Sequence, residues 1–182
     1  MDSPSSPLSA LLLVLSSPPF PPAPPSGPLS ELSQLASHRA ALEARVGALL
    51  GGSRYHCAFA RGIQGLLQEL YDRVSEVEAE VLDDGCLTAV HVLRRLRRFS
   101  AALPPVARVA RACCGARGLR GGALLQRLYE GSTDGDPLLA ETFRALLWHA
   151  QQPFFSHMVA WMAYAELESA AKQDRSEYKV CR

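Results

Sequence analysis

The most regular pattern of apolar and polar positions in the chain lies between residues 55 and 82. Apolar residues recur there at alternating spacings of four and three, and Leu66 widens the seam that they form: Ile63, Leu67, Leu70, Val74, Val77 and Val81. Charged residues occupy the other faces, so the pattern predicts an amphipathic helix with one buried stripe. Three heptads without leucine dominance favour a helix that packs inside its own chain, with a two-stranded coiled coil as the alternative.

A helix is also predicted before this segment. Ser30 or Ser33 is a candidate N-cap, and the helix runs to Leu50, with apolar residues on one face. Gly51 and Gly52 follow directly, and glycine is the residue that most often terminates a helix.

Further helices are predicted after it. Thr88 is a reasonable N-cap for a helix over about residues 89–103. Proline lacks the amide hydrogen that a helix interior needs, so Pro104 and Pro105 are expected to end this helix and open another. A short helix is expected over residues 123–130.

The segment Asp136–Glu168 predicts two helices joined at Gln151–Pro153. Asp136 is the N-cap candidate, and a proline follows it in the first turn. Both tryptophans of the chain, Trp148 and Trp161, lie in this segment. Because large aromatic side chains dominate core energetics, we expect this segment to be the packing hub of the fold.

The second of these helices carries an apolar stripe that is wider than one face. Its members are Phe154, Phe155, Met158, Val159, Trp161, Met162 and Tyr164. Most of the stripe is expected to fill a core. The remainder is available to another chain, since aromatic and methionine residues are typical interface anchors. The partner-interface candidates are Phe154, Phe155, Met158, Trp161 and Met162.

Charge is unevenly distributed although the net charge is only +1. Acidic residues concentrate over 69–84, whereas residues 85–129 contain no acidic residue and nine arginines. We interpret this as two neighbouring helices whose outer faces pair with each other. A basic patch for an acidic protein partner is the alternative, with Arg94, Arg97 and Arg98 as candidates. Nucleic-acid binding is disfavoured, because no aromatic residues interleave with the arginines.

No motif for chemistry is recognisable. The five cysteines contain no C-x-x-C pair, which argues against a zinc site and a disulfide framework and indicates a reducing compartment. The histidines lack metal-binding spacing, and no nucleophile motif is present. We therefore expect no catalytic, metal or cofactor-binding residues and no enzyme. No apolar run is long enough to span a membrane, and the leucine-rich start lacks a basic n-region, so a cytosolic protein is expected.

The sequence predicts an all-α, mostly antiparallel helical bundle with a disordered proline-rich N-terminal segment. Residues 1–53 are assigned to a leucine-rich start at Leu8–Leu15, a proline-rich linker and a helix; residues 54–168 form the bundle, and residues 169–182 a flexible tail. The tract Pro18–Pro25 favours polyproline II geometry, either as a plain linker or as a docking peptide for an SH3-like partner.

Several signatures in this order resemble a known family. They are the run from Leu119 to Leu128 (LRGGALLQRL), Ala145–His149 (ALLWH) and Met158–Tyr164 (MVAWMAY). They are similar to the N-terminal domain of the gamma-tubulin complex components, which are scaffolds for microtubule nucleation, and most similar to component four. The turn Phe99–Val106 is similar to a helix–proline–helix corner of that family. The resemblance covers roughly residues 54–168.

The resemblance implies a structural scaffold subunit that assembles sideways with other gamma-tubulin complex components in the cytoplasm, at the cytoskeleton and at microtubule-organizing centres such as the spindle pole. Gamma-tubulin binding belongs to the C-terminal domain in that family, so contact with gamma-tubulin is expected to be indirect for this chain, a truncated or N-terminal portion. Neither nucleic acid nor membrane is an expected partner. The alternative is a stand-alone helical adaptor that docks through its proline tract or arginine-rich face.

Overall fold

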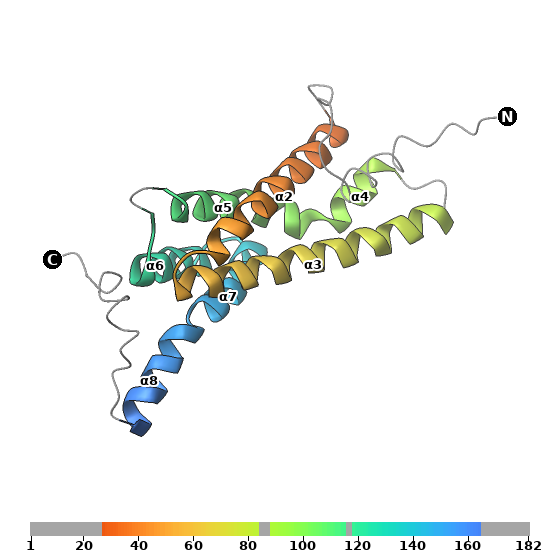
Figure 1. Cartoon of the computed structure of the whole chain (residues 1–182). Coiled ribbons are helices and arrows are strands. Elements are labelled where there is room, and N and C mark those ends of the chain that lie inside the picture. The colour runs from red at the N-terminus through yellow and green to blue at the C-terminus, as the bar shows by residue number, and fades with distance from the viewer. Residues whose placement is uncertain (1–26, 84–87, 116–117, 165–182) are drawn as a thin grey trace. The chain divides into compact units, whose positions relative to one another are not determined.

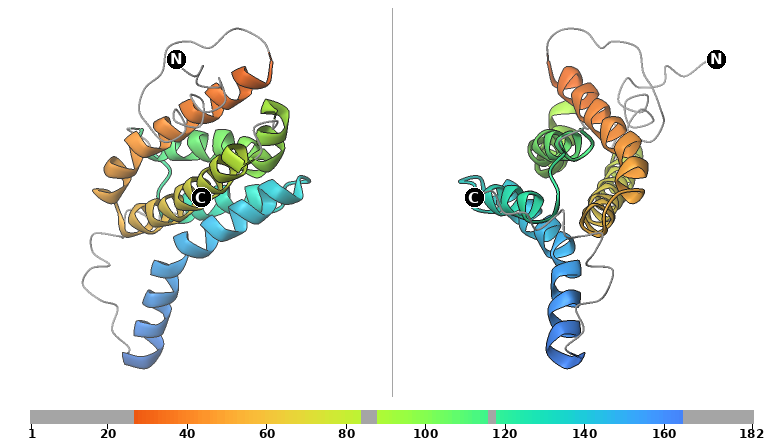
Figure 2. Two further views of the ribbon diagram at one scale, coloured as in Figure 1. Left: turned by 90° about the vertical axis from the view of Figure 1, so that its right-hand side faces the viewer. Right: turned by 60° about the vertical axis from the view of Figure 1, so that its left-hand side comes forward.

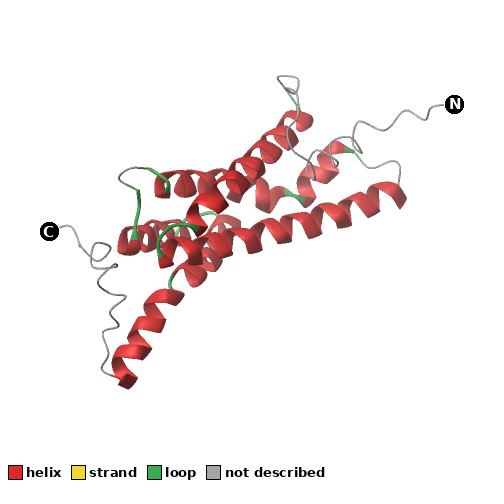
Figure 3. Cartoon of the chain, in the orientation of Figure 1, coloured by secondary structure: helices red, strands yellow, loops and turns green. Residues whose placement is uncertain are grey.

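The computed structural model describes residues 27–83, 88–115 and 118–164, and its regular elements in these ranges are all helices (Figure 1, Figure 3). The all-α prediction is therefore confirmed. The helix expected at Leu8–Leu15, the proline tract and the tail lie outside the described residues. The helices are α2 (Pro28–Leu50), α3 (Arg54–Asp83), α4 (Ala89–Arg95), α5 (Arg97–Cys113), α6 (Gly121–Ser132), α7 (Pro137–Ala150) and α8 (Gln152–Tyr164).

Two compact units share the chain. Among the described residues, the first unit contains 27–43, 65–83 and 88–107, and the second contains 44–64, 108–115 and 118–164. Helices α2, α3 and α5 each contribute one part to each unit. No helix in the described ranges combines the length and the apolar character that a bilayer span requires.

The seam predicted on α3 is buried in the single chain. In the first unit its members Leu70, Val74 and Val77 are at most 3% exposed, and so are core residues of the other helices: Leu32, Leu35, Val92, Leu96 and Leu103. A seam that is covered by its own chain is not available to a second strand, so the bundle-helix interpretation is the correct one.

A buried charge in the first unit is satisfied by neighbours on two helices. Arg39 is 3% exposed, and its Nη1 donates to Glu43 Oε1 at 3.1 Å and to the Tyr71 hydroxyl at 2.8 Å. The Tyr71 hydroxyl in turn donates to Glu43. Burial raises the pKa of Tyr71, and its hydrogen bond to Glu43 raises it further. A buried guanidinium needs such partners, so the network connects α2 to α3.

The second unit packs the start of α3 with α6 and α7. Its largest fully buried residues are aromatic and aliphatic: Leu49, Tyr55, Phe59, Ile63 and Leu124. Figure 1 and Figure 2 both show α6 alongside α7, two helices in close contact. Glycine makes this approach possible, because a Cβ on Gly131 would collide with the Phe143 ring.

The helix ends follow the capping signals in part. Gly51 and Gly52 follow α2 as predicted, but the helix already begins at Pro28, so the prediction of Ser30 or Ser33 as its N-cap is wrong. The Asp136 side chain accepts a hydrogen bond from the Leu138 amide at 3.0 Å, which confirms it as the N-cap of α7. Thr88 is the N-cap residue of α4, but its side chain makes no capping hydrogen bond.

The prediction that Pro104 and Pro105 end a helix is wrong. Both prolines lie inside α5, and the chain breaks earlier, at Leu96. The residues around the prolines are buried and apolar: Ala102, Leu103, Val106 and Ala107. Tertiary packing of this stripe holds the helix through two positions whose amide hydrogens are missing, at the cost of those hydrogen bonds.

The prediction that residues 136–168 form the packing hub is also wrong. Trp148 and Trp161 are 58% and 59% exposed, whereas the fully buried large side chains gather on α2 and α3 and at Leu96, Leu103 and Leu124. Aromatic density indicated where apolar surface lies, but burial depends on which neighbours cover it.

The α3 seam supports a stability prediction with a matched control in the same helix. Leu70 is fully buried, while Leu82 is 77% exposed. Leu70→Ala should lower the free energy of unfolding by about 2–5 kcal/mol, because it removes buried methyl groups and leaves a cavity. Leu82→Ala should change it by less than about 0.5 kcal/mol. Chemical denaturation followed by circular dichroism gives both values, and equal losses would contradict the assignment of the seam.

Adjacent cysteines at the end of α5 should differ sharply in reactivity. Burial raises the pKa of the Cys113 thiol to about 12, with a smaller contribution from Cys114, which is exposed. Only the thiolate reacts, so roughly one Cys113 in ten thousand is reactive at pH 8. Iodoacetamide followed by peptide mapping should label Cys114 in the native chain and Cys113 only after unfolding. Equal native labelling would contradict the burial of Cys113.

Candidate interaction surfaces

Helix α8 presents its large apolar side chains outward. At 100° per residue, Trp161 and Val159 mark the two edges of an apolar arc of about 160°. The arc, which we call the α8 arc, consists of residues that are 39–68% exposed: Phe154, Phe155, Met158, Val159, Trp161 and Met162. The expectation that most of this stripe is core is therefore wrong. All five apolar interface candidates lie on the α8 arc.

The less exposed side of α8 carries small or polar residues. Pro153, His157 and Ala160 are only partly exposed and lie opposite the centre of the α8 arc. Arg54, at the start of α3, is 3.0 Å from His157, measured between Nη1 and Nε2. A guanidinium has only donors, so Nε2 of His157 accepts this hydrogen bond. The contact connects the less exposed side of α8 to the start of α3, on the side away from the α8 arc.

The exposed aromatic surface begins on α7. The rings of Trp148 and Phe155 are 6.3 Å apart between centroids, and those of Phe154 and Phe155 are 5.9 Å apart. Trp148 was missed as an interface candidate. A helical wheel contains the missing signal, because Trp148 lies about 140° from the buried Phe143 on α7.

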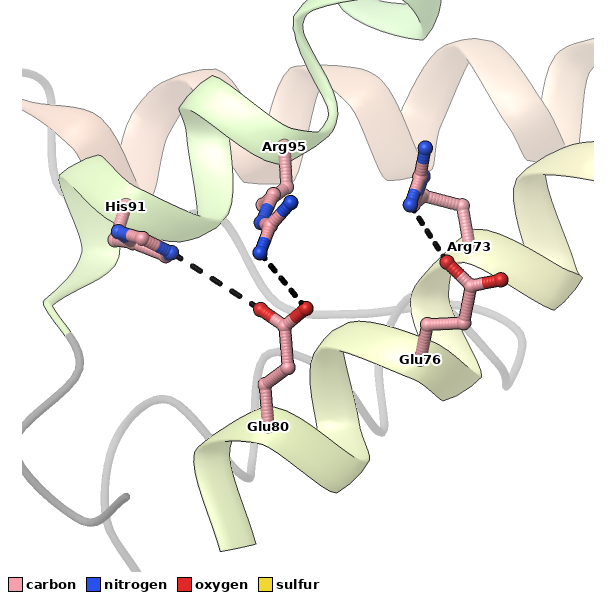
Figure 4. Close-up of polar contacts among 5 residues, drawn as sticks. All are labelled: Arg73, Glu76, Glu80, His91 and Arg95. Atoms are coloured by element: carbon pink, nitrogen blue, oxygen red, sulfur yellow. Dashed lines mark hydrogen bonds and ion pairs between the residues drawn. The ribbon is translucent and has the colours of Figure 1, made fainter. Parts of the chain in front are cut away.

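The arginine-rich segment pairs with the acidic end of α3, as its charge pattern predicted. Arg95 Nη2 is 2.9 Å from Glu80 Oε1, and Arg98 Nη1 is 3.4 Å from Glu69 Oε2. Figure 4 shows Glu80 between Arg95 and His91, with the separate pair of Arg73 and Glu76 on an earlier part of α3. These pairs are partly exposed, so each contributes at most about 1 kcal/mol and mainly sets how the helices align.

The remaining two arginine candidates have a different environment. Within the described ranges, neither Arg94 nor Arg97 forms an ion pair or hydrogen bond. Both line a shallow hollow of about 880 Å³ between the start of α2 and the α4–α5 corner. Its lining consists of Gly27, Pro28, Ser30, Glu31, Gln34, Val90, Leu93, Arg94 and Arg97. We call this the Arg94/Arg97 hollow.

The polar residues of the second unit serve the fold. His56 is 7% exposed, and its Nε2 lies 2.7 Å from the Leu119 carbonyl oxygen. The histidine therefore ties the start of α3 to the segment before α6. Across the described ranges, no group of three or more His, Cys, Asp or Glu residues is arranged to hold a metal ion.

The described residues form an all-α fold with a wide exposed apolar arc on α8. The chain matches the family of gamma-tubulin complex component N-terminal domains over residues 11–176. Because this match covers most of the chain, the chain belongs to that family. The resemblance noted in the sequence is thereby confirmed.

Two plant relatives give the scale of the similarity. The gamma-tubulin complex component 4 homolog of Medicago truncatula is 31% identical over 117 residues, which are 64% of this chain and 16% of the relative. Gamma-tubulin complex component 4 of Arabidopsis thaliana is 29% identical over 116 residues, 64% of this chain and 15% of the relative. The chain thus matches only a small part of the length of these relatives.

Fluorescence quenching tests the exposure of the two tryptophans. Trp148 is observed alone in the variant Trp161→Phe, and Trp161 alone in Trp148→Phe. Acrylamide should quench the fluorescence of each tryptophan nearly as well as in the urea-unfolded chain, because both tryptophans are more than half exposed. Strong protection of either indole in a monomer, verified by light scattering, would contradict this arrangement of α7 and α8.

Proposed function

We propose that this chain is a structural part of a gamma-tubulin complex component, and that it packs sideways against neighbouring components so that the assembly supports microtubule nucleation. The observation that carries the proposal is the α8 arc in a chain of this family. Contact with gamma-tubulin is indirect in this proposal. The site of action is the cytoplasm and the microtubule-organizing centre, and the role is not catalytic.

The chemistry of the α8 arc supports a protein partner. Two phenylalanines, a tryptophan and two methionines lie next to one another, and Trp148 extends the surface. Such residues are enriched at the centres of interfaces, where a few buried anchors supply most of the binding energy. The α8 arc contains no charged side chain, so covering it removes apolar area from water without burying an unpaired charge.

Helices α3 and α8 have different parts in this proposed role. In our proposal the buried seam of α3 keeps the bundle rigid, and the bond from Arg54 to His157 sets the rotation of α8. A preoriented helix loses less conformational entropy on binding than a free one. The bundle over residues 54–168 then acts as the interaction domain.

A recovery experiment tests the proposal. The full chain, used as bait in extract from dividing cells, should recover other gamma-tubulin complex components. Trp161→Asp should reduce that recovery at least about tenfold, because it places a charge at the edge of a buried apolar contact. Leu82→Asp is the matched control, since it changes an exposed apolar residue outside the α8 arc. Mass spectrometry measures recovery, and circular dichroism verifies that both variants remain helical.

The adaptor alternative has its own observation, the Arg94/Arg97 hollow with two arginines that lack described ion-pair partners. A chain that docks by its proline tract would lose its partners on deletion of residues 1–26. One that docks by its arginine face would lose them in Arg94→Gln combined with Arg97→Gln. A lateral scaffold keeps its partners in both cases and loses them in Trp161→Asp, so the three results separate the hypotheses.

A further inference from the structure

The Arg94/Arg97 hollow contains a serine hydroxyl as well as two arginines. Ser30 lies in the first turn of α2 and is partly exposed, and its amide donates to the Gly27 carbonyl oxygen at 3.0 Å. Arg94 comes from the last turn of α4, and Arg97 begins α5. Three elements of the same unit therefore line one open hollow with a hydroxyl and two cations.

We propose that Ser30 is a phosphorylation site and that Arg94 and Arg97 bind the phosphate that forms there. In the reaction, the Ser30 hydroxyl oxygen forms a bond to the γ-phosphorus of ATP, supplied with a protein kinase. The bond from that phosphorus to the bridging oxygen of ADP breaks, ADP leaves, and the hydroxyl proton passes to a base of the kinase. Two negative charges then stand where the hollow has two cations.

The arginines suit this role because their neighbours leave them unengaged. Arg95 and Arg98, on the same stretch of chain, are occupied by Glu80 and Glu69. Arg94 and Arg97 make no such pair among the described residues and are exposed in the hollow. A guanidinium donates two parallel hydrogen bonds to a phosphate, and a phosphate dianion carries more charge than the one carboxylate that lines the hollow, that of Glu31.

One residue of the hollow opposes the phosphate. Glu31 also lines the hollow, and its carboxylate repels a phosphate dianion. Among the described lining residues, the two arginines therefore outnumber the acidic residues by only one. Removing the Glu31 charge should therefore strengthen phosphate binding, whereas removing either arginine should weaken it. The arginine effect is the one specific to the hollow, because Glu31 is next to Ser30 in the sequence whereas Arg94 and Arg97 are brought near it by the fold.

Hydrogen bonds from Arg94 and Arg97 to the phosphate on Ser30 would connect the beginning of α2 to the α4–α5 corner. Phosphoserine opposite an arginine cluster forms charge-assisted hydrogen bonds that order the segment carrying it. The modification is then a switch that stabilises the first unit, separate from the α8 arc in the second. It does not depend on the proposed scaffold function, and recovery of partners does not enter its test.

The full chain with phosphoserine installed at position 30 provides that test. Phosphorus NMR follows the second ionisation of the phosphate, which has a pKa of about 6 when free. In the folded chain we expect this pKa to fall by about half a unit or more relative to the same chain in urea, because the arginines favour the dianion. Arg94→Gln combined with Arg97→Gln should remove most of the shift and leave only what the N-terminus of α2 contributes, and Glu31→Gln should enlarge it.

Controls make each outcome decisive. Arg144→Gln removes an exposed arginine of α7 outside the hollow and should leave the shift unchanged. If the double variant does not fold, the single variants Arg94→Gln and Arg97→Gln replace it in the test. Each of them should remove part of the pKa shift. A phosphate that titrates alike in the folded and the urea-unfolded chain overturns the proposal. So does a shift that is equally large with and without the two arginines.

Discussion

The burial of the α3 seam is the constraint on which the remaining structure depends. Its apolar positions enter the core of the first unit with Leu70 and Val74 and that of the second with Phe59 and Ile63. An amphipathic helix of this length is stable only when its apolar stripe is covered. Other helices supply that cover, and apolar residues of α2, α5, α6 and α7 are buried with it. The polar faces of the bundle are free to carry charge.

Helix α8 differs from α3 in that its apolar face is exposed. Its large side chains face solvent, and its small or polar side faces inward, where Arg54 and His157 are in contact. Exposed apolar area on this scale is costly in water, and in a monomer such patches mark interaction sites. The two helices therefore differ in how their apolar faces are used: the stripe of α3 is buried within the chain, and the arc of α8 is the surface on which the proposed partner contact rests.

Charge has two separate uses in the first unit. Glu80 and Glu69 neutralise Arg95 and Arg98, and Arg39 is satisfied by its own network with Glu43 and Tyr71. The remaining cations of the α4–α5 corner face an open hollow. Exposed ion pairs contribute little to stability, so the paired charges mainly set the alignment of the helices. Arg94 and Arg97, which have no ion-pair partner among the described residues, are the cations on which the proposed phosphate site rests.

Local and periodic features followed from the sequence alone. The seam of α3, the end of α2 at Gly51 and the cap at Asp136 depend on neighbours within one or two turns, and these predictions were confirmed. Continuation of α5 through Pro104 and exposure of Trp161 depend on contacts between distant segments. Periodicity shows which face of a helix is apolar. Only tertiary packing decides whether another part of the same chain covers that face, because burial depends on the helix together with the segment that packs against it.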